Sequence, residues 1–259
     1  MIRPRVLILR APGTNCDQET AFAFERAGAQ AETLHVNRLL ERPALFAQFQ
    51  VLCIPGGFSY GDDLGAGRIL GSQLQHHVAA EIEEFKDDGK LILGICNGFQ
   101  VLMKTRVLVA ADAAGVPAAT LTLNDSGKYE DRWVRLGVQG GKSVFLAGIE
   151  KMYLPVAHAE GKFVARDPAA FGQLDSAGQL ALRYLRQDGG AGPAAFPDNP
   201  NGAQGGVAGM CDATGRVLGL MPHPERHIDP THHPRWTRGQ PGRDGDGLQL
   251  FVNAVRYFA

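Results

Sequence analysis

The chain has 259 residues, a net charge of −1, 44% hydrophobic residues and 20% charged residues, which is typical of a soluble globular protein and gives no basic excess for nucleic acid or an anionic membrane. It has no apolar run of the roughly 18 residues that a membrane span needs, and its four cysteines include no C-x-x-C pair, which argues against a metal site. We therefore expect a cytoplasmic protein with reduced thiols and no metal, built as a single domain over residues 1–259, with two small domains as the alternative.

The first half of the chain alternates short aliphatic runs with longer helical segments. In chain order, the expected elements are a strand at Val6 to Leu9, a helix at Gln18 to Ala27 with Asp17 as its cap, strands at Ala31 to Val36 and Val51 to Ile54, a helix at Ile69 to Lys86, a strand at Lys90 to Ile95 and a helix at Asn97 to Lys104. The alternation predicts an α/β fold with a flavodoxin-like, doubly wound, mostly parallel sheet.

The second half is expected to extend this sheet with antiparallel strands. Its short strand-like runs are Trp133 to Val138, Val144 to Leu146, Val164 to Ala165, Leu180 to Leu185, Val207 to Asp212 and Val217 to Leu220. The stretch Asp188 to Gly206 is rich in Gly, Pro and Asn and is expected to be loop, as is a long polar surface segment at about 227–247. Leu248 to Phe258 is expected to form a closing helix.

The segment Gly94-Ile95-Cys96-Asn97-Gly98-Phe99-Gln100 follows a buried strand and opens a helix, which is the pattern of a nucleophile elbow. Such a turn presents Cys96 at the carboxyl edge of the sheet, and the helix N-terminus favours the reactive thiolate. The backbone N–H of Asn97 would then be one oxyanion donor. The same pattern also fits a small buried cysteine beside two packing glycines.

The segment Pro222-His223-Pro224-Glu225 follows the strand that ends near Met221. Prolines hold the backbone extended, and residues two apart in an extended segment face the same side. His223 and Glu225 can therefore lie together, and a carboxylate beside an imidazole fixes its tautomer and stabilises the imidazolium. The alternative is a surface loop with an incidental histidine and glutamate.

A third segment, Pro55-Gly56-Gly57-Phe58-Ser59, also follows a strand. Glycines at this position can turn backbone N–H groups inward, so Gly57 could supply a second oxyanion donor. A simple turn is the alternative, and a phosphate loop is disfavoured because no Gly-Lys-Ser/Thr follows. All three segments could lie at one edge of the sheet. Together they would supply the thiol, imidazole, carboxylate and two backbone donors of a covalent acyl-transfer site.

At these residues the chain resembles the class I glutamine amidotransferases and, more narrowly, the glutaminase subunits of phosphoribosylformylglycinamidine synthase in purine biosynthesis. The narrower resemblance rests on six segments that run in order through nearly the whole chain: Pro12 to Asp17, Pro55 to Asp62, Asn97 to Gln100, Pro155 to Gly161, Asn199 to Gly202 and Met221 to Arg226. Asn97 and Phe99 distinguish this subunit from many other amidotransferases, which have Leu and His at these two positions.

The resemblance implies a role for each matching residue. Cys96 would be the nucleophile, His223 the base and Glu225 its orienting carboxylate, with Gly57 and Asn97 as the oxyanion hole. Gln100 is similar to the family glutamine that lines the substrate pocket, while the segment around His158 looks like the wall of that pocket. For His158 itself we favour a structural role, and the same holds for the three cysteines other than Cys96.

The resemblance also implies the reaction and its partners. The chain would hydrolyse L-glutamine to glutamate and ammonia through a cysteine thioester, without a cofactor of its own. The ammonia would pass to a synthetase subunit that carries ATP and magnesium and converts formylglycinamide ribonucleotide to formylglycinamidine ribonucleotide, with a small accessory subunit as a further partner. The polar stretch at 227–247 is longer than expected of this subunit.

Other functions remain open on the sequence alone. The chain could serve a different synthetase, such as one that makes GMP or carbamoyl phosphate. It could be a stand-alone cysteine hydrolase, although those folds usually place their histidine soon after the elbow and none follows Cys96 here until His158. It could also be a catalytically silent scaffold subunit, which the complete set of Cys96, His223 and Glu225 argues against.

Overall fold

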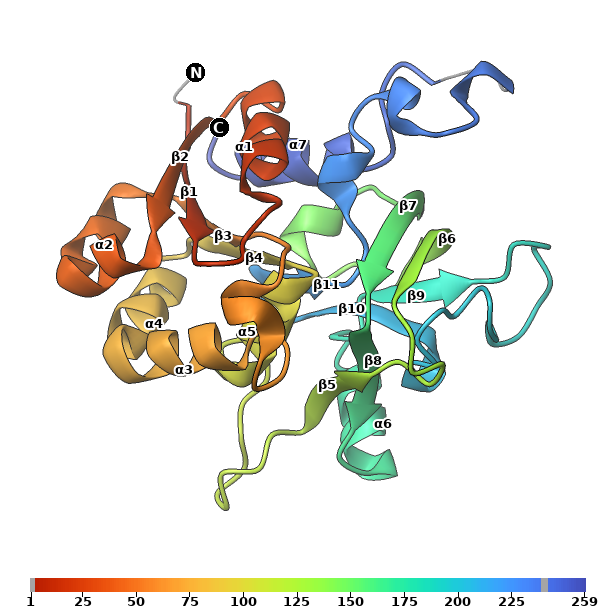
Figure 1. The fold of residues 1–259 in the computed structure, drawn as a ribbon, viewed down its shortest axis with the longest axis horizontal. Coiled ribbons are helices and arrows are strands. Elements are labelled where there is room, and N and C mark those ends of the chain that lie inside the picture. The colour runs from red at the N-terminus through yellow and green to blue at the C-terminus, as the bar shows by residue number, and fades with distance from the viewer. Residues whose placement is uncertain (1–2, 239–241) are drawn as a thin grey trace.

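The computed structural model describes residues 3–238 and 242–259 and has a nine-stranded sheet at its centre (Figure 1). The strand order is β2-β1-β3-β4-β11-β10-β9-β6-β7, and β5 and β8 form a separate two-stranded sheet. None of the helices in the described part of the chain combines the length and the apolar character that a membrane span requires.

Five strands make up the parallel half of the large sheet: β2 (Gln30–His35), β1 (Arg5–Arg10), β3 (Val51–Ile54), β4 (Leu91–Ile95) and β11 (Val217–Leu220). β3, β4 and β11 are buried along their whole length, as expected of strands covered on both faces. α1 (Asp17–Arg26) and α7 (Leu248–Arg256) pack together on one face, while α3 (Arg68–His77) and α5 (Asn97–Lys104) pack together on the other (Figure 1).

Four strands form the antiparallel half: β10 (Val207–Cys211), β9 (Leu182–Leu185), β6 (Glu130–Val138) and β7 (Lys151–His158). β7 is the edge strand, and its alternating burial shows that one of its faces packs on the core. Beside this half lie the antiparallel pair β5 (Ala119–Leu123) and β8 (Glu160–Ala165) and the helix α6 (Pro168–Ser176). The predicted α/β fold with an antiparallel extension is confirmed.

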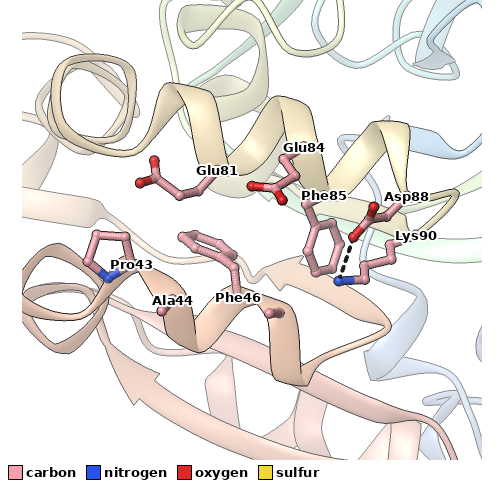
Figure 2. A pocket seen from close by; sticks show the side chains of 9 residues that line it. Pro43, Ala44, Phe46, Glu81, Glu84, Phe85, Asp88 and Lys90 are labelled. Atoms are coloured by element: carbon pink, nitrogen blue, oxygen red, sulfur yellow. Dashed lines mark ion pairs between the residues drawn. The ribbon is translucent and has the colours of Figure 1, made fainter.

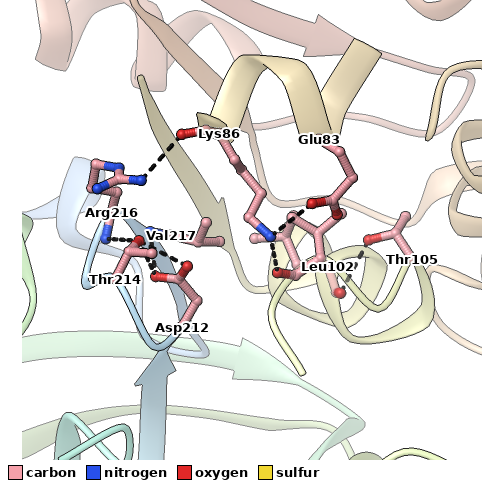
Figure 3. Close-up of polar contacts among 9 residues, drawn as sticks. Glu83, Lys86, Leu102, Thr105, Asp212, Thr214, Arg216 and Val217 are labelled. Carbon is pink, nitrogen blue, oxygen red and sulfur yellow. Dashed lines mark hydrogen bonds and ion pairs between the residues drawn. The ribbon is translucent and has the colours of Figure 1, made fainter. Parts of the chain in front are cut away.

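Polar contacts lie at the edge of the sheet where β4 and β11 begin, and one of them joins the two halves (Figure 3). Arg216 Nη2 donates to the carbonyl of Lys86 at the end of α4 (Ala79–Asp87), 3.2 Å away. Asp212, after β10, accepts from the N–H of Val217 at 3.1 Å. Because β4 and β11 run parallel, their carboxyl ends lie at the opposite edge, away from this junction.

Several sequence predictions were wrong in detail. The helix expected over Ile69 to Lys86 is two helices, α3 and α4, because the backbone leaves the helical region at Val78, where φ is −139°. Asp17 does not cap α1; it is the first residue of the helix and lies 3.5 Å from Arg10 Nε. Val144–Leu146 forms a turn of 3₁₀ helix rather than a strand, with Phe145 and Leu146 both buried. β5, β7, α6 and the short helix at Val36–Glu41 were not predicted.

The polar segment at about 227–247 is partly anchored to the antiparallel half. His233 packs on Trp133 and Tyr153, with ring centroids 4.5 and 5.3 Å apart, and Asp246 accepts from the N–H of Tyr153 at 2.7 Å. Two short 3₁₀ helices, Pro230–His232 and Trp236–Arg238, interrupt the loop. Residues 239–241 of the predicted loop lie outside the described residues. A short α2 (Val36–Glu41) completes the set of elements.

Candidate active site

The strand order places the three chemically interesting segments side by side. In the parallel register Ile54 pairs with Gly94 and Ile95 pairs with Leu220, so the ends of β3, β4 and β11 meet at one edge. The chain leaves these ends through Pro55-Gly56-Gly57, Cys96 and Pro222-His223, respectively. The fold thus brings the third segment next to two others that lie more than a hundred residues before it in the sequence.

Cys96 lies at a strained turn between β4 and α5. Its φ of 50° and ψ of −106° fall in a region that side chains rarely adopt. The turn fits only because its neighbours are glycines: a Cβ on Gly98 would lie 1.8 Å from the carbonyl oxygen of Ile54, and one on Gly94 would lie 2.6 Å from that of Gly98. Strain held by such tight packing fixes the direction of the thiol.

His223 and Glu225 form a buried pair beyond β11. Nδ1 of His223 lies 2.6 Å from Oε1 of Glu225, and both residues are 2% exposed. Burial alone lowers the pKa of His223, but the Glu225 carboxylate and the thiols of Cys96 and Cys16 raise it well above its ordinary value. Within the described chain, Nε2 of His223 has no hydrogen-bond partner. The imidazole is therefore oriented by a carboxylate and keeps one nitrogen for chemistry.

The loop after β3 provides the geometry of an oxyanion donor. Gly57 has a φ of 143°, and it forms an antiparallel bridge with Thr14 in which Phe58 donates to Gly13 at 2.9 Å. In such a pair the N–H of Gly57 points away from Thr14. Asn97 is the first residue of α5, a position whose N–H has no partner within the helix. Two backbone donors thus flank the Cys96 turn.

A cavity of about 340 Å³ opens beside Cys96 and is large enough for an amino acid. It lies between the parallel half and the antiparallel half of the sheet. Its lining includes Gly57, Asp62, Cys96, Gln100 and the end of β7 with the start of β8, residues 157–160.

Gln100 lines this cavity with both ends of its side chain engaged. Its Oε1 accepts from Asn97 Nδ2 at 3.0 Å, and its Nε2 donates to the carbonyl of Glu160. The carboxylate of Glu160 in turn accepts from the N–H of Ala66 at 3.1 Å. Glu160 therefore ties together two segments of the wall, a part that the sequence did not single out.

His158 is 3% exposed, and its Nδ1 lies 3.2 Å from the side-chain oxygen of Asn124. Asn124 also donates to the carbonyls of Lys128 and His158 itself, so its oxygen must face the imidazole. Burial and the nearby His223 lower the pKa of His158 to about 3. His158 is thus neutral near pH 7 and supports the strand that carries the cavity wall.

Cys16 is the residue that the sequence prediction left out of the site. One ring nitrogen of His223, one carboxylate oxygen of Glu225 and Sγ of Cys16 all lie within 4.8 Å of one another. Such a group can hold a metal ion, but here the donor atoms are engaged locally: His223 with Glu225, and Cys16 with Arg226 Nη2 at 3.1 Å. The only signal in the sequence was the position of Cys16 within the Pro12 to Asp17 segment.

Another hollow lies on the outside of the parallel half, between α4 and the 3₁₀ helix Pro43–Gln48 (Figure 2). The carboxylates of Glu81, Glu84 and Asp88 line it, and Asp88 pairs with Lys90 at 3.2 Å. Its lining contains no thiol, imidazole or hydroxyl, so it offers no nucleophile. The lining of the cavity beside Cys96, in contrast, includes both the candidate nucleophile and Gly57, a candidate backbone donor.

Comparison with known proteins agrees with this geometry. Residues 3–258 match the family described as the CobB/CobQ-like glutamine amidotransferase domain. The chain is 45% identical over 258 residues to the phosphoribosylformylglycinamidine synthase subunit PurQ of Dehalococcoides mccartyi, covering 99% of this chain and 98% of that protein. It is 38% identical to the PurQ subunit of Archaeoglobus fulgidus, covering 98% of this chain and 96% of that protein.

The fold is likewise similar to solved structures. A chain in the structure of PurLQS from Thermotoga maritima superposes with a TM-score of 0.75 at 29% identity, covering 100% of both chains. A glutamine amidotransferase from the same organism has a TM-score of 0.56 at 15% identity, covering 100% of this chain and 98% of that one, which shows the shared fold alone.

Proposed function

The chain belongs to the CobB/CobQ-like glutamine amidotransferases and, within them, to the PurQ subunits of phosphoribosylformylglycinamidine synthase, and from this premise we propose how its residues act. It is a glutamine amidotransferase that serves purine biosynthesis. The relatives from Dehalococcoides mccartyi and Archaeoglobus fulgidus are subunits of that synthase, and not of the enzymes that make GMP or carbamoyl phosphate.

We propose that Cys96 is the nucleophile and His223 the base. His223 takes the thiol proton while sulfur attacks the carboxamide carbon of glutamine, and it then returns that proton to the departing amide nitrogen, which leaves as ammonia. Water, deprotonated by His223, attacks the thioester; glutamate leaves and the proton returns to sulfur. Glu225 keeps Nδ1 protonated, so that Nε2 is the nitrogen that exchanges protons.

The developing oxyanion would be held by the N–H groups of Gly57 and Asn97, which lie on either side of the turn. Gln100 would shape the substrate pocket by holding the carbonyl of Glu160 in the wall. The single observation that supports this assignment best is the strained Cys96 turn, which shares one cavity with Gly57 and lies next to a buried imidazole–carboxylate pair.

We further propose that the ammonia passes to a synthetase subunit, with a small accessory subunit in the same assembly. The similarity to a chain of PurLQS from Thermotoga maritima supports a multi-subunit complex. We assign ATP and magnesium to the synthetase and no cofactor to this chain, because its glycine-rich turn after β3 lacks the Gly-Lys-Ser/Thr of a phosphate loop. A cytoplasmic location fits the four free thiols.

The test is to trap the intermediate. The complex with its synthetase is mixed with glutamine and quenched in acid, and the peptides are analysed by mass spectrometry. A γ-glutamyl adduct should appear on the peptide that contains Cys96 and should be absent from a Cys96→Ala chain. An adduct on another cysteine, or none during steady glutamine turnover, would reject the assignment.

A further inference from the structure

Cys16 is the one thiol besides Cys96 that lies beside the catalytic imidazole, and the proposed mechanism does not use it. It follows the loop after β1 and immediately precedes α1, and it is 1% exposed. Its segment, Pro12 to Asp17, was among those that marked the chain's resemblance to its family, yet it supplies none of the proposed catalytic groups. Its contacts suggest what it does.

The sulfur of Cys16 has a polar partner on each side. Arg226 Nη2 donates to Sγ at 3.1 Å, and Sγ lies 3.2 Å from the side-chain oxygen of Asn15, which can accept the S–H proton. Arg226 is itself held by Glu19 of α1, with Nε 2.8 Å from Oε1. Burial raises the pKa of the Cys16 thiol, and His223 and Arg226 offset this only in part. The sulfur is therefore a neutral, fixed thiol near pH 7.

The same sulfur packs against the imidazole and the glycine turn. A Cβ built on Gly56 would lie 2.8 Å from Cε1 of His223 and 3.0 Å from Sγ of Cys16, so the three groups share one small space. Glu225 fixes the ring through Nδ1, and Cys16 lies within 4.8 Å of both members of that pair. A side chain of this size at position 16 therefore limits how far the ring can tilt.

The backbone of Cys16 reaches the proposed oxyanion hole. Its N–H donates to the carbonyl of Gly56 at 3.3 Å. That carbonyl belongs to the same peptide as the N–H of Gly57, and the two groups of a planar trans peptide point in opposite directions. Holding the Gly56 oxygen thus sets the direction of the Gly57 N–H. One residue consequently contacts both the base and the peptide of the oxyanion donor.

We propose that Cys16 is a positioning residue of the glutaminase site, whose thiol holds the ring of His223 while its N–H holds the Gly56–Gly57 peptide. This inference rests on the proposed function. It does not make Cys16 a second nucleophile, because the thiol is neutral, buried and engaged with Arg226 and Asn15. A substitution at position 16 keeps the backbone N–H, so its expected consequence is slower proton transfer by His223 without an effect on glutamine affinity.

The groups that face His223 come from several segments of the chain. The titratable ones are Cys16 before α1, Cys96 at the elbow, Tyr129 before β6, His158 at the end of β7 and Glu225 after β11. The charged side chain of Arg226 contacts Cys16. His158 is neutral near pH 7, and the pKa of Tyr129 is raised by burial, so it is neutral too. Glu225 therefore remains the main group that raises the pKa of His223, and a change at Cys16 adds to or subtracts from its effect.

The first experiment measures kinetics of the complex with its synthetase for Cys16→Ala and Cys16→Ser. Cys211→Ala is the matched control, since Cys211 is also fully buried but lies on β10 beside Gly178. For Cys16→Ala, kcat with glutamine should fall roughly tenfold or more, because misplacing a catalytic group by about 1 Å can cost ~100-fold. KM for glutamine and the ammonia-dependent rate should stay unchanged. Serine keeps a donor and an acceptor and should recover part of the loss.

The second experiment reads the imidazole directly in the isolated chain. NMR titration of histidine labelled at Cε1, with the His223 signal assigned from a His223→Gln chain, gives the pKa of His223 in each variant. Because the Cys16 thiol helps to raise that pKa, Cys16→Ala should lower it measurably. Cys211→Ala should leave it unchanged. A purely structural role for Cys16 would instead lower the unfolding temperature without moving this pKa.

The outcomes are separable. Loss of kcat together with the lowered pKa of His223 supports the proposal. Wild-type kcat in Cys16→Ala, or an unshifted pKa of His223, overturns it while leaving the assignment of Cys96 intact. If the wild-type complex itself fails to use glutamine, the proposed function fails first. Thermal unfolding of each variant shows whether a loss merely follows unfolding, which would also count against the proposal.

Discussion

The parallel and antiparallel halves of the sheet contribute different things to the same cavity. The parallel half supplies the groups that we propose to react, which are Cys96 after β4, His223 after β11 and the Gly57 turn after β3. The antiparallel half supplies a wall, residues 157–160, where β7 turns into β8. β3, β4 and β11 are buried from end to end, whereas burial along β7 alternates.

This difference shows where rigidity is needed. A nucleophile and a base must keep their geometry within a fraction of an ångström, and fully buried parallel strands hold their ends most firmly. A wall that shapes a substrate pocket tolerates a more exposed strand. We therefore expect substitutions in the parallel half to change the rate of the chemical steps, and substitutions in the antiparallel wall to change glutamine affinity.

The largest effect is expected for Cys96→Ser. A serine hydroxyl is a far weaker nucleophile than a thiolate near pH 7, so glutamine-dependent activity of the complex should fall by a factor on the order of 10⁴ or more. Activity with added ammonia should persist, because the synthetase does not need the thiol. Parallel assays with glutamine and with ammonium salts check this. Glutamine hydrolysis at a wild-type rate would remove Cys96 from its role.

The residues that we propose to react could be named from the sequence alone because each lies in a short local pattern. The glycines around Cys96 indicate a tight turn, and the prolines around His223 indicate an extended backbone. The sequence did not predict β7, because Pro155 lies inside it and proline disfavours a central strand. β7 is an edge strand, and an edge strand tolerates proline. The run Val144–Leu146 is too short for periodicity to separate a strand from a buried turn.

Contacts between distant segments could not be predicted in the same way. Nothing local to Cys16 indicates that Arg226 and His223, about two hundred residues away, lie against its sulfur. The same holds for Glu160, whose two bonds to Ala66 and Gln100 appear only once β8 is placed beside α5. The sequence thus predicts which side chain a local turn carries, whereas the fold determines which distant residues contact that side chain.

The next largest effects should separate the two members of the buried pair. His223→Ala removes the base for both acylation and deacylation, whereas Glu225→Gln keeps a hydrogen-bonding side chain of the same shape and loses only the charge. We expect Glu225→Gln to be roughly 10–100-fold less damaging in single-turnover assays of the complex. Should Glu225→Gln prove the more damaging change, the assigned roles would have to be exchanged.

A smaller effect tests whether the parallel half is fully organised without a partner. The Gly56–Gly57 peptide is its weak point, because glycine reorients at low cost and the bond from Cys16 that holds the Gly56 carbonyl is long, at 3.3 Å. We expect glutaminase turnover of the purified chain to rise when the synthetase is added. One oxyanion donor is worth on the order of 100–1000-fold, which sets the upper limit. Equal turnover in both states would show that the hole is preformed.

The smallest effect is expected in the antiparallel wall and has the opposite kinetic signature. Glu160→Gln weakens the bond to the N–H of Ala66, which links β8 to the loop after Asp62, while the carbonyl that holds Gln100 stays in place. Replacing a charge-assisted hydrogen bond by a neutral one costs about 1 kcal/mol, which corresponds to a rise in KM for glutamine of roughly fivefold. Because Glu160 does not touch the reacting atoms, kcat should change little.

Glu150→Gln, an exposed carboxylate next to β7, is the matched control and should leave both constants unchanged. If Glu160→Gln instead lowered kcat at constant KM, the wall would take part in chemistry, and the division between the two halves would not hold.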